Sequence, residues 1–151
     1  MNDVLTYFIT WCTYGAWLPG DARNWRKRGA GQQLPRPLLE KWCRERMRFD
    51  AVLLRLQDRP VVEEACREHC EFRGWTILAI SARSNHVHAV VVANENPKIV
   101  RNQLKANGTR LLRTQADPLV RDPTWAKGGD IEILDDDESI HAAVAYVLEG
   151  Q

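Results

Sequence analysis

Two apolar runs separated by only three residues constrain the fold of this chain most strongly. Residues 75–82 (WTILAISA) and 86–93 (HVHAVVVA) are rich in β-branched types and are joined by Arg83, Ser84 and Asn85. Such residues suit a pleated, partly buried surface, and a connection this short joins antiparallel strands, whereas parallel strands need a long crossover. The sequence therefore predicts a β-hairpin in the second half of the chain.

Helical patterns lie on both sides of this hairpin. Residues 60–73 (PVVEEACREHCEFR) place apolar side chains three and four positions apart, and Gly74 follows as a stop signal. Residues 97–114 begin with a proline and repeat that spacing, with basic residues between the apolar ones. We expect a helix at each place, with Phe72 and Ile99 among the inward-facing side chains.

The remaining segments complete a recognisable order. Residues 5–13 and 131–134 are strand candidates, and residues 138–149 form a last helix with acids at its start. This order is β-α-β-β-α-β followed by a C-terminal helix, which predicts an α+β, ferredoxin-like antiparallel sheet with helices on one face. We expect one domain over residues 1–151, because the chain is short and 44% hydrophobic. A glycine-rich loop and a helix over residues 35–50 make up an insertion at about 15–58.

A net charge of +1 hides a strong segregation of charge. Basic residues gather in the insertion and along residues 97–127, whereas no Lys or Arg follows Lys127 and acids crowd the last segment. A basic body suits the phosphates of a nucleic acid. The candidate nucleic-acid contacts are Arg23, Arg26, Lys27, Arg28, Lys98, Arg101, Lys105, Arg110 and Arg113.

No stretch of the sequence approaches the roughly 20 apolar residues that a membrane span needs. The N-terminus also lacks the charged and apolar regions of a signal peptide. The four cysteines show no dense framework of disulfides. We therefore expect a cytoplasmic protein with reduced thiols and no membrane partner.

His86 and His88 are the first candidates for chemistry. Side chains alternate along a strand, so both imidazoles project from one face while Val87 points to the other. Two adjacent imidazoles make half of a metal site, although a pair of polar residues on a solvated face would show the same pattern. A third ligand must come from another element, and the last helix is the natural supplier.

Tyr146 lies on that last helix among small residues (AVAYVLEGQ). It is either an aromatic packing residue or a nucleophile. A phenol has a pKa of about 10, so its attack on phosphorus needs help. A divalent ion would provide it by polarising a phosphoryl oxygen, and the basic helix would hold the flanking phosphates.

These residues resemble a known family, the single-tyrosine HUH transposases, including the relatives associated with repeated palindromic elements. The resemblance lies in the triplet from His86 to His88 and in Tyr146 within YVLEGQ, and extends to WTILAISARSNHVHAVVV, LKANGTRLL and TWAKGGD. It implies a dimeric nuclease and ligase that acts on single-stranded DNA folded into hairpins. The tyrosine would form a 5′-phosphotyrosine with the help of Mg²⁺ or Mn²⁺, of which Mn²⁺ suits two imidazoles better.

The third metal ligand departs from the family pattern. Relatives carry Gln or Asn four residues after the tyrosine, whereas this chain has Gly150 there and Gln151 one residue later. Five residues turn Gln151 away from Tyr146 on a regular helix, unless Gly150 lets the helix end unwind. Gln151 is the predicted ligand, and Glu149 is its rival.

Two other functions compete with a transposase. The first is a non-catalytic single-stranded nucleic-acid binding domain of the same fold, which would need no paired histidines. The second is a phosphoesterase with a histidine nucleophile. That class needs a further histidine in the pattern, but position 90 is Val.

Overall fold

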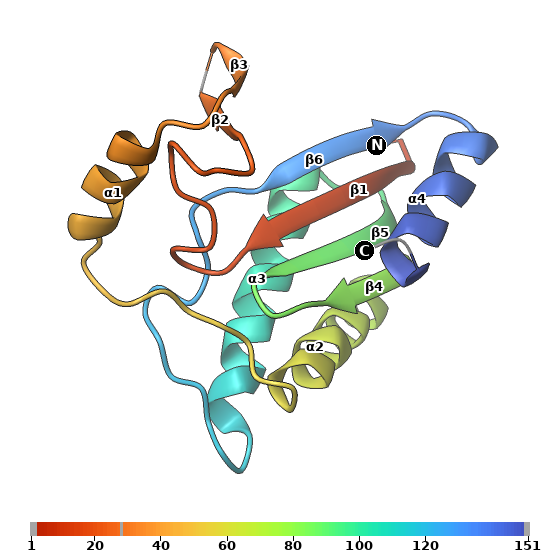
Figure 1. The fold of residues 1–151 in the computed structure, drawn as a ribbon. Helices are drawn as coiled ribbons and strands as arrows, with labels where there is room; N and C mark the ends of the chain where they lie inside the picture. Colours follow the sequence, from red (N-terminus) through yellow and green to blue (C-terminus); the bar gives the residue numbers. More distant parts are fainter. Residues whose placement is uncertain (1–2, 28, 150–151) are drawn as a thin grey trace.

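The computed structural model describes residues 3–27 and 29–149 and contains a four-stranded antiparallel sheet (Figure 1). Its strands are β1 (Leu5–Cys12), β4 (Thr76–Ala82), β5 (His86–Ala93) and β6 (Asp130–Leu134), in the spatial order β4-β5-β1-β6. The helices α2 (Asp58–Arg73) and α3 (Pro97–Thr114) provide the two crossovers, and α4 (Asp137–Glu149) ends the chain. The predicted β-α-β-β-α-β order with a C-terminal helix is confirmed.

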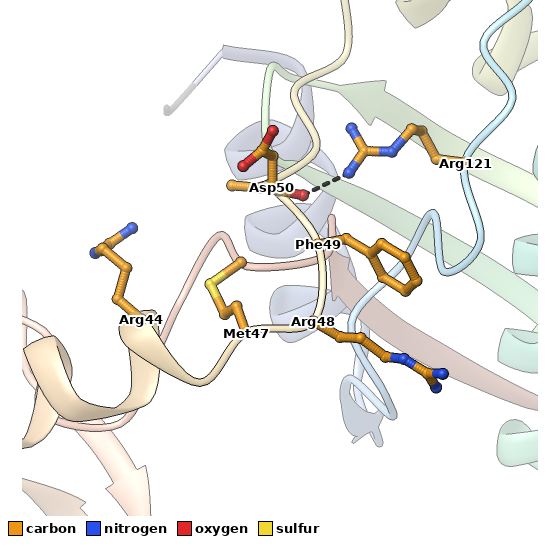
Figure 2. Close-up of a pocket in the computed structure, with 7 residues that line it drawn as sticks. Arg44, Met47, Arg48, Phe49, Asp50 and Arg121 are labelled. Carbon is orange, nitrogen blue, oxygen red and sulfur yellow. Dashed lines mark hydrogen bonds between the residues drawn. The ribbon is translucent and has the colours of Figure 1, made fainter.

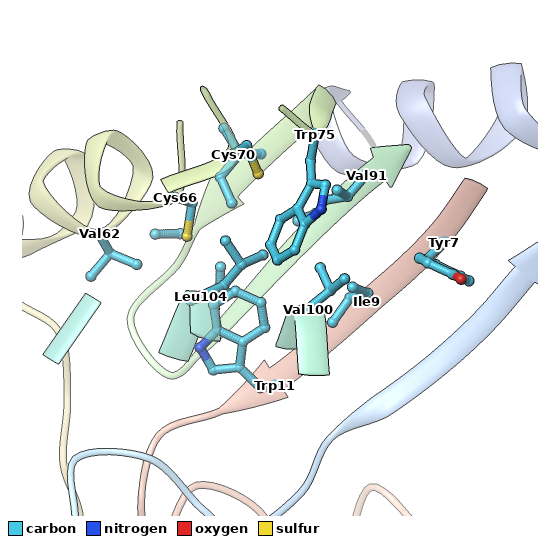
Figure 3. Packing of buried hydrophobic residues seen from close by; sticks show 14 of the residues in the cluster. Tyr7, Ile9, Trp11, Val62, Cys66, Cys70, Trp75, Val91, Val100 and Leu104 are labelled. Carbon is cyan, nitrogen blue, oxygen red and sulfur yellow. The ribbon is translucent and has the colours of Figure 1, made fainter. Parts of the chain in front are cut away.

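One face of the sheet forms the main hydrophobic core with α2 and α3 (Figure 3). Alternation directs Ile9 and Trp11 of β1 to this face, together with Val87 and Val91 of β5. Burying each such side chain contributes about 1.5–3 kcal/mol. This core holds the sheet as a rigid platform.

The predictions for Phe72 and Ile99 were wrong, since these side chains are 81% and 42% exposed. The buried residues of α3 recur every four positions from Val100, so Ile99 lies one residue, or about 100°, off that stripe. Phe72 follows the buried Cys70 by two residues, which places it on the opposite side of α2. Both apolar side chains therefore face solvent.

Helix α4 covers the other face of the sheet. Ala143 and Val147, one turn apart, pack with Ala79, Val90 and Leu134 in a second, smaller cluster. Val90 is an even number of residues from His86 and His88, so the three side chains share one face of β5. Helix α4 therefore lies on the face from which both histidines project. Helices α2 and α3 thus cover one face of the sheet, and α4 covers the other.

The insertion contains more structure than the sequence predicted. The expected loop includes a small hairpin of β2 (Trp25–Lys27) and β3 (Gly31–Gln33), and helix α1 (Pro37–Glu45) is shorter than the expected 35–50. Trp25 is buried and donates from Nε1 to the carbonyl oxygen of Leu34, which holds this hairpin down. Helix α1 itself has no buried residue among those that the structure describes.

A buried carboxylate fixes the point where the insertion rejoins the core. Asp58, fully buried at the start of α2, accepts hydrogen bonds from the backbone and guanidinium of Arg55 and from Gln115. Burial by itself would raise the pKa of Asp58, but the hydrogen bonds from Arg55 and Gln115 hold that pKa below its ordinary value. The ionised carboxylate therefore stabilises the fold.

Within residues 3–27 and 29–149, no helix is long and apolar enough to cross a membrane.

Candidate metal and tyrosine site

The register of the central strands gathers the candidate ligands. His88 lies opposite Thr10 of β1, and His86 lies opposite Cys12. The two imidazole centroids are 4.6 Å apart, and the residue of His88 is only 8% exposed. The predicted shared face of the histidines is therefore present, on the side of the sheet that α4 covers.

Hydrogen bonds fix one nitrogen of each ring. Nδ1 of His86 lies 2.8 Å from Oδ1 of Asn85, and Nδ1 of His88 lies 2.7 Å from the hydroxyl of Thr10. An amide oxygen can only accept, so Nδ1 of His86 donates, and in the neutral ring the lone pair is then on Nε2. The Thr10 hydroxyl can accept in the same way from His88. Metal-binding histidines are commonly oriented by such a partner at the other nitrogen, so the pair fits a divalent ion.

The turn before β5 is itself held in place. Asn85 accepts at its carbonyl oxygen from the backbone N–H of Thr13 at 2.9 Å, and Arg83 donates to the carbonyl oxygen of His86 at 2.8 Å. The bond between the backbone N–H of Arg83 and His86 closes the β4–β5 hairpin, and the bond from Thr13 ties its turn to the end of β1.

Tyr146 lies against His88. Its ring centroid is 5.5 Å from that of His88 and 6.0 Å from that of Phe8, and Phe8 in turn lies 5.6 Å from His88. Ala143 and Val147 anchor α4, and Tyr146, one residue before Val147, remains 47% exposed. A partly exposed phenol against one imidazole of the histidine pair suits a reactive group better than a core aromatic.

The third metal ligand is not identified by the geometry. Among residues 3–27 and 29–149, no three His, Cys, Asp or Glu side chains are grouped to hold an ion, so Glu149 completes no such set here. Gln151, the predicted ligand, and Gly150 lie outside the part of the chain that the structure describes.

The basic helix does not lie beside the tyrosine, contrary to the simplest interpretation of the sequence. Helix α3 packs on the opposite face of the sheet from the histidines. Lys105 donates from Nζ to the carbonyl oxygens of Ala126 and Gly128, each at 2.9 Å, and burial, followed by the nearby Arg101, lowers its pKa. Lys105 therefore acts in part as a structural tie between α3 and the following loop.

A groove of about 480 Å³ runs between α3 and that loop. Arg101, Lys105 and Arg113 line it from the helix, and Arg121 and Lys127 line it from the loop. Lys98 and Arg110 are exposed elsewhere on α3, and Arg110 lies 3.8 Å from Glu68. The groove gives the basic residues of α3 a shared surface.

The basic residues of the insertion differ among themselves. Arg23 forms a salt bridge with Asp21 at 2.6 Å and stacks over Trp17, so it stabilises its own loop. Hydrogen bonding to Arg23 is the main cause that lowers the pKa of Asp21. Arg26 and Lys27 are exposed on β2, and Arg28 lies outside the described residues.

Sequence reasoning missed Thr10 and the role of Asn85. Neither belongs to a motif, and only the β1–β5 register shows that Thr10 reaches His88. A signal was present in the alternation of β1, which puts Phe8, Thr10 and Cys12 on the face opposite Ile9 and the main core.

The comparisons with known proteins place the chain among the transposases. Residues 43–149, more than half of the chain, match the model of the family described as "Transposase IS200 like". The chain belongs to this family. No curated protein sequence matches the chain.

Two solved structures resemble the fold. One is described as the REP-associated tyrosine transposase bound to a REP hairpin; it is 11% identical with a TM-score of 0.53, over 97% of this chain and 67% of that one. The other is a candidate transposase from Deinococcus radiodurans R1, 13% identical with a TM-score of 0.50, over 100% of this chain and 93% of that one. At these identities the likeness shows the fold.

Proposed function

We propose that this transposase is a single-stranded DNA endonuclease and strand transferase that uses Tyr146 as its nucleophile at hairpin-flanked sites. The observation that carries the proposal is the cluster of Tyr146, His88 and His86, with ring centroids 5.5 Å and 4.6 Å apart between neighbours. A binding domain alone would not need two imidazoles oriented through Nδ1 beneath a phenol.

The proposed step is an exchange of one phosphate ester for another. Oη of Tyr146 attacks phosphorus, an O–P bond to the tyrosine forms, and the bond between phosphorus and the 3′ oxygen breaks. The phenol loses its proton and the departing 3′ oxygen gains one, which leaves a 5′-phosphotyrosine and a free 3′-hydroxyl. A later 3′-hydroxyl reverses the step and rejoins DNA, so no external energy source is needed.

His86 and His88 would hold Mg²⁺ or Mn²⁺ through Nε2. Two imidazole ligands favour Mn²⁺, because Mg²⁺ prefers oxygen. When bound, the ion would polarise a phosphoryl oxygen and stabilise negative charge. Gln151 remains the proposed third ligand, with Glu149 as the alternative.

The proposed DNA surface combines single-stranded and hairpin segments. The similar structure described as bound to a REP hairpin supports a hairpin partner for this chain. The groove beside α3 supplies cations for the phosphates, with Arg101 and Arg113 among its lining residues. The family resemblance also leads us to propose a homodimer.

Covalent capture tests the nucleophile. The wild-type protein with Mn²⁺ and a hairpin oligonucleotide should give an adduct that resists denaturant, and Tyr146→Phe should abolish it while hairpin binding persists. Tyr7→Phe is the matched control, because Tyr7 is buried in the core on the other face of the sheet and donates to the carbonyl oxygen of Glu95. An adduct formed by the Tyr146→Phe protein would exclude Tyr146 as the nucleophile.

Two further outcomes separate the competing functions. A wild-type protein that binds the hairpin but forms no adduct with either ion would be a nucleic-acid binding domain. An adduct that survives chelation of the metal would favour a histidine nucleophile.

A further inference from the structure

A basic pocket of about 670 Å³ lies where the insertion returns to the sheet (Figure 2). It is lined by residues just after α1, including Arg48 and Phe49, by Arg44 of α1 itself, and by Arg121 from the other side. Three arginines and a single aspartate, Asp50, line it. The volume is within the range of about 300–1,000 Å³ that is usual for small-ligand sites.

The pocket presents an aromatic ring between cations. Phe49 is 46% exposed, with one side packed against Tyr14 at a centroid distance of 6.5 Å. The guanidinium of Arg48 lies 5.7 Å from the Phe49 centroid, and Figure 2 shows Arg121 on the other side of the ring. Exposed aromatic rings with neighbouring guanidinium groups are the usual platform for an unpaired base and its phosphates.

Backbone hydrogen bonds join the pocket to the strands of the candidate site. Val52 donates to the carbonyl oxygen of Tyr14 at 2.9 Å, just after β1, and Leu54 donates to that of Ser84 at 2.7 Å, in the turn before β5. Val52 and Leu54 are both buried, at 1% and 2% exposure. The pocket is therefore fixed at the end of the sheet where β5 and His86 begin.

Arg121 connects this pocket with the groove beside α3. Its guanidinium donates to the carbonyl oxygen of Asp50, and the same residue also lines the groove. A strand that leaves the groove would thus meet the pocket through a shared cation.

We propose that this pocket binds one unpaired nucleotide of the DNA next to the cleaved phosphodiester. The base stacks on Phe49, and Arg48 and Arg121 contact the adjoining phosphates. This inference rests on the proposed function, because it assumes that single-stranded DNA approaches His86 at the same end of the sheet. A free nucleotide would lack the phosphates that adjoin the bound base in a strand. The proposed ligand is therefore a nucleotide within a DNA strand.

Binding of a hairpin with a single-stranded tail, compared with the same hairpin without one, tests the pocket. In fluorescence anisotropy, Phe49→Ala should weaken binding of the tailed hairpin on the order of 10-fold and leave the blunt hairpin unchanged. Phe49→Trp should keep the affinity, because it keeps a stacking ring. Phe72→Ala is the matched control, since Phe72 is 81% exposed on α2 and lines neither pocket.

Arg48→Ala gives a second measurement that does not remove apolar packing. For the tailed hairpin, it should reduce the magnitude of the slope of log K against log salt concentration by about 0.7. This is the value expected when one phosphate contact to a single strand is lost. A tail carrying 5-iodouracil should also crosslink to the peptide that contains Phe49. Tailed-hairpin affinity and salt slope equal to wild type in both variants would refute the pocket.

These results separate the pocket from the chemistry. If the wild-type protein forms no adduct but Phe49→Ala still loses tail-dependent affinity, the proposed reaction fails and the nucleotide site stands. If the adduct forms and the tail makes no difference in either protein, the pocket fails and the reaction stands.

Discussion

Thr10 offers a direct test of how the sheet would orient His88, the proposed metal ligand. Thr10→Val keeps the shape of the side chain but removes the hydroxyl that lies 2.7 Å from Nδ1 of His88. The ring would then lose the partner that favours a lone pair on Nε2. Losing such a partner typically lowers metal affinity about 10- to 100-fold, or about 1.4–2.7 kcal/mol.

The burial of the site decides where in that range the effect should fall. His88 is only 8% exposed, and Phe8 and Tyr146 lie against its ring, so water has little room to replace the hydroxyl. We therefore expect a loss in the upper half of the range, roughly 30- to 100-fold. The free energy of unfolding should fall by only about 0.5–1.5 kcal/mol, the usual contribution of one hydrogen bond.

Titration of the DNA-free protein with Mn²⁺ measures this effect without any reaction. Free Mn²⁺ can be followed by electron paramagnetic resonance, and the heat of binding by calorimetry. Thr6→Val is the matched control, because Thr6 lies on the same face of β1 but opposite Val92 and Leu134 rather than a histidine. A Thr10→Val protein that binds Mn²⁺ within twofold of wild type would refute the orienting role of the hydroxyl.

Three further substitutions test the fold that supports the site. Asp58→Asn should cost about 1–3 kcal/mol at neutral pH in urea denaturation. The folded-state pKa of Asp58 lies below its unfolded value of about 3.9. The difference in free energy of unfolding between wild type and Asp58→Asn should therefore be complete above about pH 5 and shrink as the pH falls through the folded-state pKa. A difference that stays constant down to pH 3 would contradict this reasoning. Lys105→Met should cost about 1–2 kcal/mol by removing bonds to two carbonyl oxygens, and an unchanged urea midpoint would show that Lys105 is no structural tie. Gly129→Ala should lower the melting temperature more than Gly128→Ala, since both have positive φ but only at Gly129 would Cβ lie 2.5 Å from the carbonyl oxygen of Thr10; equal losses would exclude that clash.

The strongest sequence signals specified the sheet and the placement of the histidines. The strand over residues 86–93 and the helix over residues 97–114 have the bounds that their patterns predicted. Strict alternation in β5 was enough to place His86 and His88 on one face. These features depend on the local period of the chain, which a sequence displays directly.

Features that depend on contacts between distant segments were beyond the sequence. The hydroxyl of Thr10 reaches His88 across 78 positions, and nothing local marks either as the other's partner. Periodicity assigns Lys105 to the polar side of its helix but cannot reveal the two carbonyl oxygens that occupy its amine. Hydrogen bonds between distant segments, such as those of Lys105, decide which Lys and Arg side chains remain available to contact DNA.

The two faces of the sheet divide stability from chemistry. The face under α2 and α3 contains the larger cluster, including Ile9, Trp11 and Val87, whereas two residues of α4 as described, Ala143 and Val147, are buried. The histidines thus lie on the sheet, where the register of β1 and β5 sets their position. Tyr146 lies on α4, which is anchored by fewer buried side chains. Such a division suits the proposed role of Tyr146 as a nucleophile that would carry a DNA end to a second strand, because the sheet can keep the phosphate geometry while the helix adjusts.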